Sequence, residues 1–82
     1  MQKDEKKLEE LKAIIARRNT ALNMLLMKVK IIFELSVEIR ESIVDELSKE
    51  FIEYGIEQGG EPNSYGLRIE ELIDFCGLTK EL

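Results

Sequence analysis

The sequence predicts an all-α protein, and two observations carry this prediction. No glycine or proline occurs between Met1 and Tyr54, whereas all five glycines and the single proline follow that point. Strong helix formers such as Leu, Lys, Glu, Ala and Met dominate the first fifty positions. Charged residues reach 35% of the chain, against about a quarter in average proteins. Such a chain is typical of long amphipathic helices.

The spacing of apolar residues predicts one long amphipathic helix over about residues 4–57. Steps of 3.6 residues from Leu8 to Phe51 meet an apolar side chain at eleven of thirteen positions. A turn between two helices normally resets this phase, and here the phase continues across the whole span. Two alternatives stay open. One is a break near residues 17–20, and the other is a fresh helix start at Ser42, which forms a capping box with an aspartate three residues later.

A loop and a short helix are expected after the long helix. The loop covers residues 58–64, where two glycines, a proline, an asparagine and a serine end the helix and turn the chain. A short amphipathic helix over about residues 65–76 follows, with Ser64 as its N-cap and Gly77 as the C′ residue after its end. Residues 78–82 form a tail, and the whole chain makes one helical domain.

Between Leu22 and Ile39 the apolar stripe widens into a collar around the expected helix. Ten residues of helix span about 15 Å, so a short helix folded back from its loop would not reach this collar. An apolar strip of that size does not stay exposed in a soluble monomer, and an unbroken helix therefore predicts a second chain as its cover. We expect a dimeric or higher helical bundle. The predicted centre of its interface consists of Leu22, Leu25, Leu26, Val29, Ile32 and Phe33.

Charge is divided unevenly along the chain. The net charge is −5, but residues 1–33 carry eight basic and four acidic residues, and residues 34–82 carry four basic and thirteen acidic residues. The first part is therefore +4 and the second −9. Ends of opposite sign favour antiparallel alignment, either within a hairpin or between two chains. The expected partners are a second copy of this chain and another protein.

Several kinds of chemistry lack the residues that they need. The chain has no histidine, which is the commonest general base and the commonest metal ligand. Its only cysteine, Cys76, cannot form a zinc site of the Cys/His type, and this thiol is expected to be packed and inert. The acidic clusters at 34–45 and 70–74 are expected to be solvated helix faces. We predict no catalytic residue, no cofactor site and no metal site.

Composition also argues against a membrane or nucleic-acid role. The most apolar stretch, residues 21–37, contains Lys28, Lys30 and Glu34, and is too short and too charged to span a bilayer. A lone thiol fits a reducing compartment, so the predicted location is the cytoplasm. Basic residues near the N-terminus could contact phosphates, but acidic residues are interleaved with them and no aromatic residue lies among them to stack on bases.

The sequence therefore predicts a non-catalytic interaction protein, such as a subunit, adaptor, assembly chaperone or regulator. Two other classes stay open as alternatives. One is a small transcriptional regulator that contacts the transcription machinery or nucleic acid. The other is a metal-dependent enzyme whose acidic faces would meet across a dimer.

Overall fold

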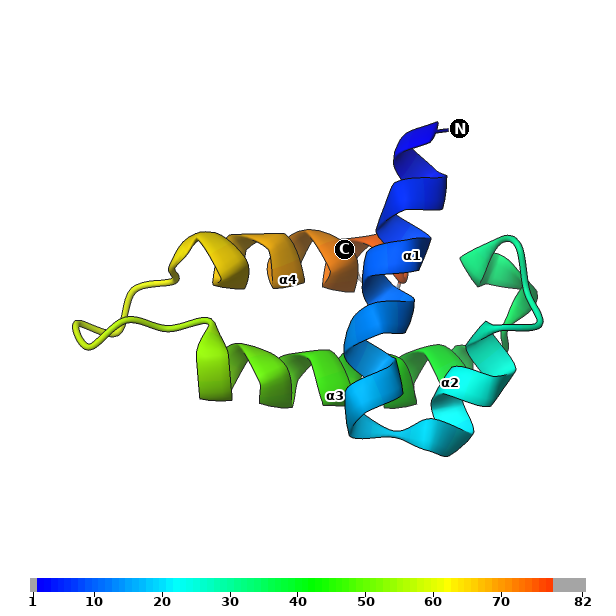
Figure 1. Cartoon of the computed structure of the whole chain (residues 1–82), viewed down its shortest axis with the longest axis horizontal. Coiled ribbons are helices and arrows are strands. Elements are labelled where there is room, and N and C mark those ends of the chain that lie inside the picture. The colour runs from blue at the N-terminus through cyan, green and yellow to red at the C-terminus, as the bar shows by residue number, and fades with distance from the viewer. Residues whose placement is uncertain (1, 78–82) are drawn as a thin grey trace.

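The computed structural model describes residues 2–77, and the side chains from Glu5 onward. The described elements are α1 (Gln2–Arg18), α2 (Thr20–Leu26), the 3-10 turn η1 (Ile32–Glu34), α3 (Val37–Tyr54) and α4 (Ser64–Phe75). In Figure 1, α3 and α4 run alongside each other as a hairpin, and α1 crosses them. The Cα radius of gyration is 12.4 Å, close to the roughly 12 Å expected of a compact chain of this length.

The all-α prediction is confirmed. Within residues 2–77 the only strand-like pairing is an isolated bridge between Ile56 and Pro62, in the segment that joins α3 to α4. None of the described helices has the length and the hydropathy that crossing a bilayer requires.

The prediction of one continuous helix over residues 4–57 is wrong, because the chain breaks at Asn19 and again between α2 and α3. Asn19 has an extended backbone, with φ −153° and ψ 97°. Its side-chain oxygen accepts a hydrogen bond from the Leu22 N–H at 3.0 Å and so caps α2. The residue that caps the second helix thus ends the first, and the alternative of a break near residues 17–20 is confirmed.

Helix α3 begins after Ser36, not at Ser42. The Ser36 hydroxyl accepts a hydrogen bond from the Ile39 N–H at 3.2 Å, as an N-cap does. Ser42 lies within the helix and donates its hydroxyl to the Glu38 carbonyl instead. Because the third residue after Ser36 is isoleucine, this cap lacks the reciprocal Glu or Gln of a capping box, and only the serine marks the start of the helix.

Helix α4 lies where the sequence predicted a short helix, but its cap is Asn63 and not Ser64. The Asn63 side-chain oxygen accepts a hydrogen bond from the Gly66 N–H at 2.8 Å. Gly77 follows the helix with φ +73°, the left-handed conformation expected of a C′ glycine. The predicted tail, residues 78–82, lies outside the described residues.

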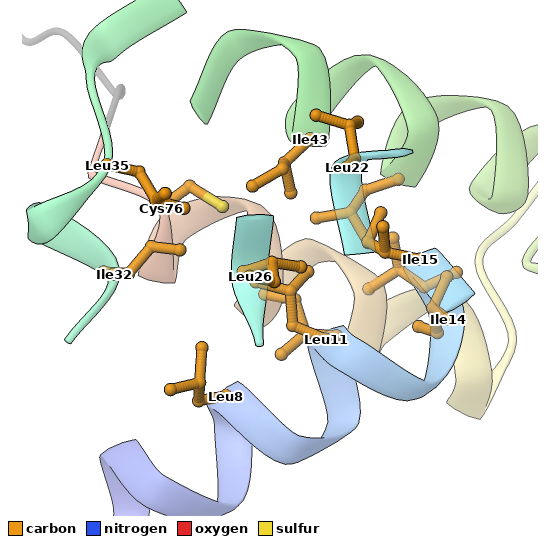
Figure 2. Close-up of a cluster of buried hydrophobic side chains, with 13 residues drawn as sticks. Leu8, Leu11, Ile14, Ile15, Leu22, Leu26, Ile32, Leu35, Ile43 and Cys76 are labelled. Atoms are coloured by element: carbon orange, nitrogen blue, oxygen red, sulfur yellow. The ribbon is translucent and has the colours of Figure 1, made fainter. Parts of the chain in front are cut away.

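The core takes side chains from every element, and Figure 2 shows many of them converging. The chain therefore covers part of the predicted collar by itself, because a broken helix can fold back over its own apolar residues. The buried apolar residues are Leu8, Leu11, Ile14, Ile15, Leu22, Leu26, Ile32, Leu35, Ile43, Leu47, Ile69, Leu72 and Cys76.

Three helices are joined by the carboxylate of Glu50 on α3, which is only 1% exposed. Arg17 donates to its Oε2 at 2.8 Å, Arg18 donates to its Oε1 at 2.8 Å, and the Tyr65 hydroxyl donates to Oε2 at 2.6 Å. Burial raises the pKa of Glu50, but the hydrogen bonds from Tyr65 and the two arginines outweigh burial and hold the pKa below its ordinary value. The charged carboxylate thus fixes α1 and α4 against α3.

Helices α3 and α4 also meet through two glycines at the end of the hairpin. A Cβ atom added to Gly55 would lie 2.9 Å from the Cα of Gly66 and 2.9 Å from the carbonyl oxygen of Phe51. The two backbones approach so closely that no side chain fits between them. The Asn63 N–H also donates to the Gly55 carbonyl at 2.9 Å, which closes the connecting segment.

The substitution Glu50→Gln should lower the free energy of unfolding at pH 7 by roughly 2–4 kcal/mol, because it leaves two arginines without their buried charge partner. Loss of the charge also predicts a change with pH. The folded-state pKa of Glu50 is lowered, so its stabilising effect is present above the ordinary value of 4.5 and is lost as the pH falls through the lowered pKa. The Glu50→Gln variant should lack this part of the decrease in the free energy of unfolding at low pH.

Urea unfolding followed by circular dichroism at several pH values measures both effects of Glu50→Gln. The matched control is Glu53→Gln, because Glu53 also pairs with Arg18 but its side chain is 52% exposed. The control should lower the free energy of unfolding much less than Glu50→Gln does, because solvent screens an exposed pair. Equal losses in the two variants would contradict a central role for the buried carboxylate.

The substitution Gly66→Ala should lower the free energy of unfolding by about 1–3 kcal/mol, because the new methyl group would press on the backbone of Gly55. Gly59→Ala is the matched control, since no atom lies within 4 Å of a Cβ added there. The control should stay within about 0.5 kcal/mol of the wild type. Thermal unfolding of both variants tests the close contact, and an unchanged Gly66→Ala protein would exclude it.

Candidate functional site

Six large apolar side chains remain exposed in the segment that runs from the end of α2 through η1 to the start of α3. Their exposed fractions range from 37% for Leu25 to 65% for Met27. In Figure 1 this segment lies at one end of the molecule, away from the loop that joins α3 to α4. We call this surface the apolar face. Its residues are Met24, Leu25, Met27, Ile31, Phe33 and Val37.

The apolar face arises because this segment folds as short elements. The N–H groups of Lys28 and Val29 donate to the carbonyls of Leu25 and Leu26, both at 3.2 Å, and end α2 in a tight turn. Leu26 on α2 is fully buried, while its apolar neighbours on either side point outward. A seven-residue helix and a single 3-10 turn contact the core on one side only, so their remaining apolar side chains stay in solvent.

The structure separates the six residues that the sequence predicted as an interface. Leu25 and Phe33 lie on the apolar face and are 37% and 61% exposed. Val29 is half-buried and packs against the core. The other three are core residues with exposed fractions of 8% or less, namely Leu22, Leu26 and Ile32. A charge at these three positions would unfold the chain itself and would not report on association.

Four residues of the apolar face are not among the six that the sequence predicted as the centre of the interface. Their only signal was their place in the widened collar, where runs of adjacent apolar residues hide which side chain faces inward. These residues are Met24, Met27, Ile31 and Val37.

The exposed ring of Phe33 is held in place by Arg40. The guanidinium carbon of Arg40 lies 4.9 Å from the centroid of the ring, within the range of a cation–π interaction. Nε of the same arginine donates to the Leu35 carbonyl at 3.2 Å, and Nη1 donates to the Cys76 carbonyl at 3.0 Å. Phe33 is therefore fixed relative to the start of α3 and the end of α4, although most of its surface faces solvent.

Charged residues are interleaved with the residues of the apolar face along the chain and also follow them. Lys28 and Lys30 precede η1, whereas Glu34, Glu38 and Glu41 follow Phe33, and all five are exposed. None of them forms an ion pair within the described part of the chain, where every ion pair involves Arg17, Arg18 or Arg68. The segment that carries the apolar face therefore also exposes charges of both signs that form no ion pair in those residues.

A second, smaller group of exposed apolar side chains lies at the opposite end of the molecule. Ile52 and Tyr54 in the last turn of α3 are 69% and 59% exposed, and Leu67 in the first turn of α4 is 53% exposed. In Figure 1 these turns form the tip of the α3–α4 hairpin, far from the apolar face. The molecule thus presents apolar side chains at both ends.

A hollow of about 480 Å³ between α1 and α4 offers less to a ligand than the apolar face does. Its apolar floor includes Ile14 and Leu72, which are already 5% and 1% exposed, so little further apolar area can be buried there. Arg17 and Arg68 at its rim already pair with carboxylates. The hollow therefore offers a ligand little apolar area to bury, and its two arginines already have carboxylate partners.

The basic residues at the end of α1, considered above for phosphate contacts, turn toward α3. Arg18 donates through Nε to Glu46 at 3.2 Å and through Nη1 to Glu53 at 3.0 Å, in addition to its bond with Glu50. Arg17 also pairs with Glu50. These two guanidinium groups are occupied by carboxylates of the same chain.

The cysteine thiol and the acidic side chains are the groups that could carry chemistry. Cys76 at the end of α4 is fully buried, and burial raises the pKa of its thiol from 9.0 to about 11, although the charge of Arg40 lowers it in part. The thiol is packed, as the sequence predicted, while its inertness stays a prediction. Within the described residues, no group of three or more acidic or cysteine side chains is placed to hold a metal ion.

Comparison with known proteins gives no relative for this chain. No protein-family model, no curated protein and no solved structure matches it. The function must therefore be argued from its own surfaces.

The thiol of Cys76 should react with an aromatic disulfide reagent at pH 8 at least about 100-fold more slowly in the folded protein than in urea, because a pKa raised by two units leaves that much less thiolate. The thiol should also make stability fall as the pH rises from 9 toward 11, since its folded-state pKa is raised and deprotonation favours the unfolded chain. Cys76→Ala is the control for this pH dependence. Rapid reaction of the folded protein would contradict the packed thiol.

Proposed function

We propose that this chain is a non-catalytic helical interaction protein that associates with copies of itself and with another protein through the apolar face. The observation that carries the proposal is the exposure of six large apolar side chains in one short segment, up to 65% for Met27. Several large apolar side chains exposed in one short segment commonly mark an interaction site.

The composition of the face supports this role. Met24 and Met27 have flexible, polarisable side chains that adapt to the shape of a partner. Phe33 supplies a large apolar surface. The guanidinium carbon of Arg40, 4.9 Å from the centroid of the ring, already holds the ring in place. Because an ordered aromatic side chain loses little conformational entropy on binding, it suits the centre of an interface.

The residue inventory supports a role without catalysis. The sequence has no histidine, and its single thiol is buried with a raised pKa, so the usual nucleophile and general base are not presented at a surface. Subunit, adaptor, assembly chaperone and regulator are the roles that fit a small binding protein of this kind. The proposal includes a cytoplasmic location, because a lone cysteine fits a reducing compartment.

The double substitution Met27→Ser with Ile31→Ser should weaken self-association at least about 10-fold and leave the monomer folded, because both side chains are largely exposed. Light scattering on a sizing column across a dilution series measures the effect. The wild type should elute with a mass that is a multiple of 9.5 kDa and that falls on dilution. Circular dichroism should show unchanged helix content in the variant.

The matched control is Ile52→Ser, which removes an even more exposed side chain from the other end of the molecule. The control should associate as the wild type does. If the wild type stays at 9.5 kDa at every concentration, self-association is wrong. If Ile52→Ser weakens association as much as the double substitution does, the apolar face is the wrong surface.

A further inference from the structure

A single residue separates α1 from α2, and the backbone is helical on both sides of it. The Asn19 N–H donates to the Ile15 carbonyl at 2.8 Å, and the Asn19 carbonyl accepts from the Asn23 N–H at 3.0 Å, both in the i to i−4 pattern of an α-helix. Only the extended backbone of Asn19, with φ −153° and ψ 97°, interrupts the helix. A change of conformation at this one residue would therefore join α1 and α2 into one helix over residues 2–26.

The bend at Asn19 is held mainly by its own side chain. The side-chain oxygen accepts from the Leu22 N–H at 3.0 Å, and the side-chain nitrogen donates to Glu46 at 3.4 Å. Thr20 and Ala21 begin α2, and the first N–H groups of a helix have no acceptor within that helix. In a continuous helix, the N–H groups of Thr20, Ala21 and Leu22 would each donate to a carbonyl of α1. A straight form thus exchanges side-chain hydrogen bonds for helical backbone ones.

The sequence across the bend is that of a continuous helix. No glycine or proline occurs before Gly55, and the 3.6-residue spacing of apolar residues that includes Leu8 continues past Asn19 to Leu22 and Leu26. Leu8, Leu22 and Leu26 are all buried, so a straight helix would carry one face made of core residues. The local sequence therefore favours the straight form, and packing within one chain requires the bent form.

The contacts that hold α1 on α3 and α4 do not depend on the connection between α1 and α2. Arg17 and Arg18 each bind Glu50 at 2.8 Å, although Glu50 lies more than thirty residues away along the chain. Closer to the N-terminus of α1, Glu10 pairs with Arg68 on α4. The same side chains would meet in the same way if α1 came from one copy and α3 and α4 came from another.

A straight helix cannot leave α1 on α3 and α4 of its own chain. In Figure 1 the chain turns at the end of α1, and this turn places α1 across both helices. If Asn19 becomes helical while α2 stays in the core, α1 points elsewhere and exposes apolar side chains such as Leu11 and Ile15, which are fully buried in the bent form. A second copy of this chain offers the α3 and α4 surface, with Glu50 and Arg68, that would cover them again.

We propose that two copies of this chain exchange α1. In the exchanged dimer Asn19 is helical, α1 and α2 form one helix over residues 2–26, and α1 of each copy lies on α3 and α4 of the other. The monomer and the exchanged dimer share the same contacts of α1 with α3 and α4, so the conformation of Asn19 and the protein concentration decide between them. This inference goes beyond the proposed function, because the exchange does not use the apolar face.

The exchanged dimer should form on refolding from urea at high concentration and should persist after dilution, because α1 leaves its place only when the core opens. Light scattering on a sizing column then separates it from the 9.5 kDa monomer. Every protein in this test carries Met27→Ser with Ile31→Ser, which removes association through the apolar face. Asn19→Ala should raise the dimerisation constant at least about 10-fold, because it removes the cap and favours helix at both hinges of the dimer.

Thr20→Pro should have the opposite effect. Proline suits the first position of α2, and it restricts the preceding residue to the extended conformation that Asn19 already has. Inside a continuous helix the same proline would remove a hydrogen bond and clash with the preceding turn. The substitution should therefore lower the dimerisation constant at least about 100-fold, and circular dichroism should show that the monomer stays folded.

Ser36→Ala is the matched control for Asn19→Ala. It also removes a helix cap, the hydrogen bond from the Ile39 N–H to the Ser36 hydroxyl at 3.2 Å. This cap lies at the start of α3, where the preceding element is the 3-10 turn η1 and not an α-helix that α3 could continue. The control should lower stability without raising the dimerisation constant, whereas equal gains in both variants would overturn the role of Asn19 as the hinge.

A mixing experiment tests whether α1 crosses between copies. Because Glu10 pairs with Arg68, Glu10→Lys and Arg68→Glu each place like charges together. An exchanged heterodimer of these two variants would pair the introduced lysine with the introduced glutamate and Glu10 with Arg68, whereas an unexchanged dimer would keep like charges together within each copy. After joint refolding, native mass spectrometry should find heterodimers at least about 3-fold more abundant than both homodimers together.

The control mixture combines Lys28→Glu with Glu57→Lys, two exposed positions that make no ion pair within residues 5–77. These two variants should pair at random. Random pairing of the Glu10 and Arg68 variants as well would show that α1 stays on its own chain.

The outcomes distinguish this inference from the proposed function. A dimer that survives dilution, that Asn19→Ala favours, that Thr20→Pro abolishes and that prefers the charge-matched heterodimer supports the exchange. The absence of a persistent dimer in Asn19→Ala, or a dimer that Thr20→Pro leaves intact, overturns it. The proposed function fails separately, if the chain with an intact apolar face does not associate in a dilution series without refolding. Thr20→Pro with that face intact should still associate there as the wild type does.

Discussion

The fold depends on one buried carboxylate that two consecutive arginines share. Arg17 and Arg18 stand at the C-terminal end of α1, where the helix dipole favours cations, and each takes one oxygen of Glu50. An unpaired carboxylate at this depth would be strongly unfavourable, so α1 is stable on α3 only in the orientation that brings both guanidinium groups to it. Apolar contacts between two helices are compatible with many crossing angles, whereas the pairing of both arginines with one carboxylate is compatible with few. Tyr65 extends the same restriction to α4.

The position of α1 determines what the following segment can bury. From Asn19 to Ser36 the chain must return from the end of α1 to the start of α3, and it does so through a seven-residue helix and a 3-10 turn. Each of these short elements has one side on the core, so inward residues such as Leu26 alternate with outward ones such as Met27. The apolar face therefore follows from the ion-paired crossing of α1 and α3. A longer or straighter connection between these two helices would not have exposed its side chains to solvent.

The helical content and the position of α4 could be predicted because they depend on local composition and caps. The continuity of the first helix could not, because Ile32 and Phe33 are adjacent and a 3.6-residue step meets an apolar residue whichever of them faces inward. The structure buries Ile32 and exposes Phe33, and this shift of one residue is invisible to the periodicity. The buried carboxylate was also beyond prediction. Nothing local distinguishes Glu50 from Glu46 or Glu53, and its two arginine partners lie more than thirty residues away in the sequence. The ambiguity between adjacent apolar residues such as Ile32 and Phe33 also explains why only two of the six predicted interface residues lie on the apolar face.

The tip of the α3–α4 hairpin lies at the opposite end of the molecule from the apolar face, and it carries the exposed side chains of Ile52, Tyr54 and Leu67. Two chains joined at the apolar face would therefore display two such tips, pointing away from each other. A target with two matching sites would engage the second tip at the high local concentration created by the first, and the gain would be one of avidity. The apparent affinity for that target would depend on the fraction of the protein that is dimeric. The concentration of the chain would therefore change this affinity, although the contacts between each tip and the target would stay the same.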